Sequence, residues 1–148
     1  MKSSLNTYFF LSARLLLGAI FIAASLDKIA HPAEFAKIVS NYQILPGYLI
    51  NIAAILLPWL EAVLGLFIVC GWWLPGATAL ANLLLVCFLG ALAQAAARGI
   101  DLQCGCFSVK AAGSTHTIWY FVRDSLFLLL GTTVTIHAFR AHSAGTPK

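Results

Sequence analysis

The feature that most constrains this chain is a run of 36 residues, Ala62 to Ala97, without a single charged side chain. As one α-helix the run would be about 54 Å long, whereas about 20 residues cross a bilayer core. The segment from Gly71 to Gly76 divides it, with turn-forming residues and two tryptophans of the kind that anchor at membrane interfaces. We therefore predict two membrane-spanning helices, at about residues 49–69 and 77–97, joined by a tight turn.

Two further apolar segments flank this pair, at about residues 8–29 and 118–139. The first ends before His31-Pro32, where proline is expected to stop a helix. Its apolar stretch extends on both sides of Arg14, so we expect it to be retained as a helix rather than cleaved as a secretory signal. Residues 32–47 are more polar and predict a short amphipathic segment at the membrane surface.

Composition supports a location in the bilayer, because 61% of the residues are hydrophobic and only 9% are charged. Soluble domains carry about 25% charged residues. The basic residues are scattered, which argues against a nucleic-acid partner. We predict an all-α fold for residues 1–148: a four-helix transmembrane bundle in a bacterial inner membrane, with both termini on one side.

Ionisable groups within a span are costly and usually pair or act. Counting depth along the helices allows a pair between Arg14 and Glu61, and a second between Asp27 and Arg123, with Lys28 and Asp124 nearby. Such pairs lock helices together, or one of the carboxylates relays protons or binds a polar substrate. Small residues suited to close helix approach accompany them: Gly18, Ala19, Ala23 and Gly65.

The polar loop 98–117 contains Cys104-Gly105-Cys106, shortly before the last helix. Glycine lets the two sulfurs meet, and so small a disulfide ring is strained and readily exchanged. Lys110 favours thiolate at one sulfur. These features are typical of a redox-active pair. Thiol oxidation belongs outside the cytoplasm, which places the loop in the periplasm and both termini in the cytoplasm, since the positive-inside rule does not decide.

Three alternatives stay open for this pair. One is a static structural disulfide. Another is a soft-metal site for copper or zinc that also uses His116 or His31, although zinc normally takes four ligands. The third is two free thiols without a function, which would be unusual in so short a loop. The remaining cysteines, Cys70 and Cys87, are expected to be buried apolar packing residues.

The order of motifs resembles the DoxX/MauE family over about residues 8–135. The residues that carry the likeness are Arg14 to Gly18, Leu57-Pro58-Trp59-Leu60-Glu61, Gly65 and Gly71, and then Cys104-Gly105-Cys106-Phe107 with Trp119 and Arg123-Asp124, as in its MauE-type branch. Ser108 departs from the glycine often found there. The resemblance implies a redox-associated membrane protein linked to maturation of a disulfide-rich subunit of methylamine dehydrogenase, beside a thioredoxin-like partner.

The leading hypothesis is therefore a membrane thiol–disulfide oxidoreductase or maturation factor. Cys104 and Cys106 would exchange electrons with a thioredoxin-like partner, and a quinone held near Phe107, Trp119 and Tyr120 would accept them. The likeness to other four-helix thiol oxidases that use quinones is one of architecture, which does not fix function. The second hypothesis is a non-catalytic membrane subunit or small-molecule carrier, in which the intramembrane charges matter and the loop disulfide is structural.

Overall fold

The computed structural model describes residues 2–98 and 117–144, which form helices throughout and no strand. The five helices are α1 (Lys2–Ala30), α2 (Pro32–Asn41), α3 (Gly47–Cys70), α4 (Leu74–Ala97) and α5 (Thr117–Ala144). The all-α prediction is confirmed, and each long helix includes the segment predicted for it.

Within the described ranges, three helical segments are long and apolar enough to cross a membrane: Tyr8–Ala30, Gly47–Cys70 and Leu74–Ala97. They cover the first three predicted spans, so the chain is a multi-pass membrane protein. The helix α5 is long enough, with 28 residues, but it carries Arg123 and Asp124 near its start. The fourth span therefore stays a prediction.

The turn between α3 and α4 lies where the charge-free run was expected to break. Gly71 ends α3 in the left-handed conformation with φ of 77°, and its N–H donates to the carbonyl of Phe67. Trp73 is also left-handed, with φ of 44°, and Pro75 stands in the first turn of α4, where its missing N–H costs nothing.

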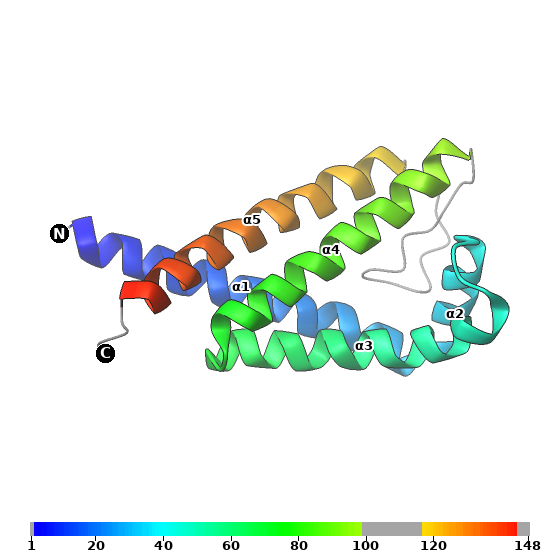
Figure 1. Cartoon of the computed structure of the whole chain (residues 1–148), viewed down its shortest axis with the longest axis horizontal. Coiled ribbons are helices and arrows are strands. Elements are labelled where there is room, and N and C mark those ends of the chain that lie inside the picture. The colour runs from blue at the N-terminus through cyan, green and yellow to red at the C-terminus, as the bar shows by residue number, and fades with distance from the viewer. Residues whose placement is uncertain (1, 99–116, 145–148) are drawn as a thin grey trace.

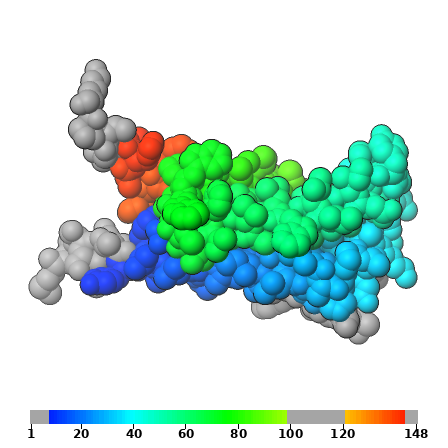
Figure 2. Space-filling model, turned by 90° about the horizontal axis from the view of Figure 1, so that it is seen from below, coloured from blue at the N-terminus to red at the C-terminus, as the bar shows by residue number. Residues whose placement is uncertain are grey.

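The long helices form an elongated bundle in which α1 packs on α3 and α4 on α5 (Figure 1). Figure 2 shows α1 and α3 side by side along one face of the molecule. The start of α1, the end of α5 and the α3–α4 turn share one end of the bundle, which we call the termini end (Figure 1). The helix α2, the end of α4 and the start of α5 share the other, which we call the α2 end.

The main core lies between α1, α3, α4 and α5 and is built from buried aliphatic and aromatic side chains: Ala13, Leu17, Phe21, Leu64, Ile68, Ala77, Ala81 and Val134. A second, smaller cluster lies at the α2 end, where Phe35 and Ile38 of α2 pack on Ala54 of α3. The short amphipathic segment is therefore confirmed as α2. Large apolar side chains that stay exposed, such as Leu66, Leu83 and Leu129, suit a surface in contact with lipid.

Candidate functional site

Two glycines set the distance and register between α1 and α3. A Cβ added to Gly18 would lie 2.9 Å from the Gly65 carbonyl oxygen, and one added to Gly65 would lie 2.9 Å from the Gly18 carbonyl oxygen. Neither helix backbone leaves room for a side chain at this point. The expectation that Gly18 and Gly65 permit close helix approach is confirmed, and it brings the next polar groups along these helices together.

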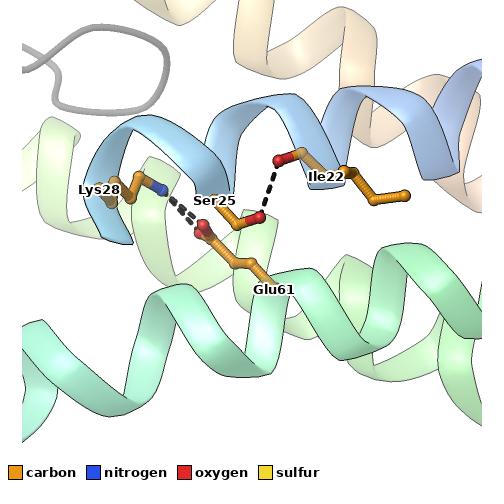
Figure 3. Close-up of polar contacts among 4 residues, drawn as sticks. All are labelled: Ile22, Ser25, Lys28 and Glu61. Carbon is orange, nitrogen blue, oxygen red and sulfur yellow. Dashed lines mark hydrogen bonds and ion pairs between the residues drawn. The ribbon is translucent and has the colours of Figure 1, made fainter. Parts of the chain in front are cut away.

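From these glycines toward the α2 end, Lys28 of α1 and Glu61 of α3 form a buried ion pair (Figure 3). The ammonium nitrogen lies 2.8 Å from Oε1 and 2.7 Å from Oε2 of the carboxylate. Both residues are almost fully buried, at 1% and 4% exposure. A buried pair of this kind is favourable only with close contact, because each charge loses its hydration.

The surroundings of Lys28 are aromatic as well as charged. Its nitrogen lies 5.2 Å from the ring centroid of Phe35 on α2 and 5.0 Å from that of Phe88 on α4. Rings at this distance attract a cation through their negative faces. Three helices other than α1 thus contribute to the environment of this one ammonium group.

Lys28 also lines an apolar cavity of about 400 Å³ between α2, α3 and α4. Apart from Lys28, the lining side chains are almost all apolar: Phe35, Ile38, Val39, Tyr42, Ile44, Leu45, Leu57, Leu84, Cys87, Phe88, Ala91 and Gln94. Its size falls within the usual range of small-molecule sites, about 300–1,000 Å³. The cavity and the ion pair together form the candidate site.

Asp124 of α5 lies near the same cluster. It is buried, at 4% exposure, and lines a small hollow that Lys28 and Glu61 also line. Its oxygen Oδ1 accepts hydrogen bonds from Nε and a terminal nitrogen of Arg123, at 3.0 and 2.9 Å. Lys28, Glu61 and Asp124 therefore lie close together, whereas the sequence had assigned Glu61 to Arg14 and had placed only Lys28 and Asp124 near each other.

The predicted pair between Arg14 and Glu61 is wrong. Arg14 donates to the carbonyl of Val69 at 3.3 Å, near the termini end. The depth count assumed that Ala30 and Gly47 lie in one plane, but α3 extends beyond the end of α1, where α2 covers it (Figure 1). The sequence signal that was missed is the register set by Gly18 and Gly65. In this register Arg14, four residues before Gly18, faces Val69, four residues after Gly65.

The predicted pair between Asp27 and Arg123 stays a prediction, because the ion pairs that the structure gives these residues are each with a residue nearby along the chain. Asp27 lies 3.6 Å from Nδ1 of His31, one turn further along the chain. Arg123 pairs with its neighbour Asp124. Adjacent residues on a helix point in different directions, but the arginine side chain is long enough to reach the carboxylate of the residue that follows it.

The two cysteines within the helices are not buried packing residues as expected. Cys70 and Cys87 are both free and exposed. Cys70 ends α3 at the termini end, whereas Cys87 lies on the face of α4 that borders the cavity. A thiol in a lipid-facing position loses nothing by exposure, because the surrounding phase is apolar.

The other predicted site residues fall outside what the structure describes. Cys104, Cys106, Phe107 and His116 lie outside the described residues, and Trp119 and Tyr120 belong to α5 without described side chains. Among residues 2–98 and 117–144, no group of three potential metal ligands occurs.

Long lipid-facing helices around a buried ion pair define the class: a multi-pass membrane protein whose buried charged side chains, among the described residues, are Lys28, Glu61 and Asp124. The chain belongs to the MauE family, because the sequence model of the family described as "Methylamine utilisation protein MauE" matches residues 6–137. A bacterial membrane is therefore its setting.

Curated relatives agree with the family. The chain is 40% identical over 96 residues to methylamine utilization protein MauE of Paracoccus denitrificans, covering 64% of this chain and 51% of that protein. It is 34% identical over 111 residues to the MauE protein of Methylophilus methylotrophus, covering 72% and 58%. The chain thus spans about half the length of the curated relatives it matches. No solved structure matches it.

Proposed function

We propose that this chain is a membrane thiol–disulfide redox or maturation protein that acts through Cys104 and Cys106 at the periplasmic face. The observation that carries the proposal is the Cys-Gly-Cys sequence between two helices whose adjoining ends lie together at the α2 end. The names of the relatives extend the proposal to the utilisation of methylamine.

Chain length limits how far the cysteine pair extends from the bundle. Cys104 follows Arg98, the last described residue of that side, by six residues, so it lies within about 22 Å of it. This limit supports a proposal in which the pair works at the same end of the molecule as α2, the Lys28–Glu61 pair and the apolar cavity. A soluble thioredoxin-like partner would meet it at the membrane surface.

The proposed reaction balances without a metal. A dithiol of the partner is oxidised by the Cys104–Cys106 disulfide through a mixed disulfide, and the partner leaves as its own disulfide. The reduced pair then returns two electrons and two protons to an acceptor in the membrane, for which we propose a quinone that becomes a quinol.

The test is a redox titration of the full chain in lipid nanodiscs, with thiol alkylation read by mass. We expect the Cys104–Cys106 pair to gain two labels together, reversibly, at a higher potential than structural disulfides, which resist glutathione. The Cys70→Ser, Cys87→Ser variant is the matched control and should titrate alike. A pair that stays oxidised under glutathione would instead favour a structural disulfide.

The partner is tested by trapping. A Cys104→Ser or Cys106→Ser chain leaves one thiol unable to resolve a mixed disulfide, so one of the two should accumulate covalently bound to a thioredoxin-like protein. If the double variant supports maturation as well as the unaltered chain does, the non-catalytic carrier is correct. The apolar cavity is the observation that favours this second candidate.

A further inference from the structure

We propose that the apolar cavity between α2, α3 and α4 binds a quinone, and that Lys28 donates a hydrogen bond to one of its carbonyl oxygens. The described residues that would hold it belong to α1–α4 and the segment between α2 and α3, whereas the sequence suggested Phe107, Trp119 and Tyr120. Its role as electron acceptor rests on the proposed function, but binding itself does not require the cysteines.

The first argument is an unused donor. A lysine ammonium has three N–H groups, and among the described residues the hydrogen-bond partner of Lys28 is the Glu61 carboxylate alone. The side chain of Lys28 is 2% exposed. A buried donor without a partner is costly, so a ligand with an acceptor oxygen in the cavity gains from meeting it.

The second argument is charge. Glu61 already neutralises Lys28 at 2.7 Å, so an anionic head group would have to compete with the carboxylate in a buried site. A neutral carbonyl oxygen accepts the remaining N–H without disturbing the pair. Quinones have such oxygens and no charge.

The third argument is shape. Phe35 of α2 and Phe88 of α4 both line the cavity close to the Lys28 nitrogen, and the other walls are mainly aliphatic. Aromatic side chains pack well against a planar ring. A lipid acyl chain would fill the same volume but would leave the Lys28 donor unmet, which favours the quinone.

Access comes from the bilayer. Cys87, which lines the cavity, is exposed on the lipid-facing side of α4. A quinone with an apolar tail is dissolved in that phase, so it enters without crossing water. Cys87 therefore also reports occupancy, since a bound ligand would shield its sulfur.

The experiment uses the full Cys104→Ser, Cys106→Ser chain in lipid nanodiscs, so that binding is independent of the loop thiols. The probe is decylubiquinone, whose ring is fully substituted and does not add thiols. Alkylation of Cys87 and Cys70 by N-ethylmaleimide is followed by mass. We expect saturating decylubiquinone to slow the alkylation of Cys87 at least about fivefold. The alkylation rate of Cys70 should not change, since Cys70 lies at the termini end of α3, away from the cavity.

Two variants test where the quinone binds. Lys28→Met removes the donor and should weaken binding about five- to tenfold, the effect of one lost hydrogen bond. Ala91→Phe fills the cavity without touching the ion pair and should abolish protection, whereas Ala93→Phe, exposed on the same helix outside the cavity, should not.

Decylbenzene, with the same tail and no carbonyl, should not protect Cys87. The proposal is overturned if decylubiquinone fails to protect, if it protects Ala91→Phe equally, or if decylbenzene protects as well. Protection in a chain whose loop thiols prove redox-inactive would uphold this site and reject only the proposed function.

Discussion

The two halves of the α1–α3 contact differ sharply. Toward the termini end, Gly18 and Gly65 bring the backbones together, and the core around Leu17 and Ile68 is completely buried. Toward the α2 end, the same helices hold a buried ion pair, and α4 leaves a cavity beside it. One region is built for close packing, whereas the other keeps charge and space inside a bilayer, where both are costly.

The difference indicates that one half of the contact serves stability and the other half serves function. Close packing at the termini end fixes the register that presents Lys28 to Glu61. The cavity end has a smaller packed cluster and keeps a buried ion pair beside open space, which we propose serves the binding of a ligand. The predictions below disturb each half in turn.

The largest loss of stability is expected from Glu61→Leu. Removing the carboxylate takes the ion-pair partner away from the buried Lys28 ammonium, which costs about 3–5 kcal/mol. The free energy of unfolding in mixed detergent measures it. The double variant Lys28→Met, Glu61→Leu should recover most of the loss, because it removes both charges; a double variant as unstable as the single one would show that the pair itself is not the cause.

A smaller loss is expected from Gly65→Ala. The added methyl group meets the backbone carbonyl of Gly18, so the helices must separate, at a cost of about 1–3 kcal/mol. Gly90→Ala is the matched control, since a Cβ there has no neighbour within 4 Å. Equal effects of the two substitutions on unfolding would mean that α1 and α3 do not approach closely.

The smallest effect is expected between α4 and α5. Asn82 donates a hydrogen bond to the Thr135 hydroxyl at 2.7 Å, so Thr135→Val should cost about 0.6–1.7 kcal/mol, as for other interhelical bonds in membranes. Thr133 is exposed and donates to the Leu130 carbonyl in its own helix, so Thr133→Val should be close to neutral in the same unfolding assay. A larger loss at Thr133 would place the α4–α5 contact on the wrong face of α5.

Helix positions could be predicted because length, proline and glycine act locally. The division at Gly71 and the amphipathic α2 followed directly from such signals. The ion-pair partners of the charged residues could not be predicted, because they depend on how far α3 extends past α1. Nor could the face of Cys87 be predicted, since α4 is apolar all round and its sequence carries no distinction between core and lipid.

The most direct test of the central claim is the redox state and sidedness of Cys104 and Cys106 in living cells. Intact cells are treated with a membrane-impermeant maleimide, with and without prior reduction, and the labelled peptides are identified by mass. We expect both cysteines to be labelled only after reduction, and from outside the cytoplasmic membrane. Labelling that requires cell lysis, or that occurs equally without reduction, would contradict a periplasmic redox pair.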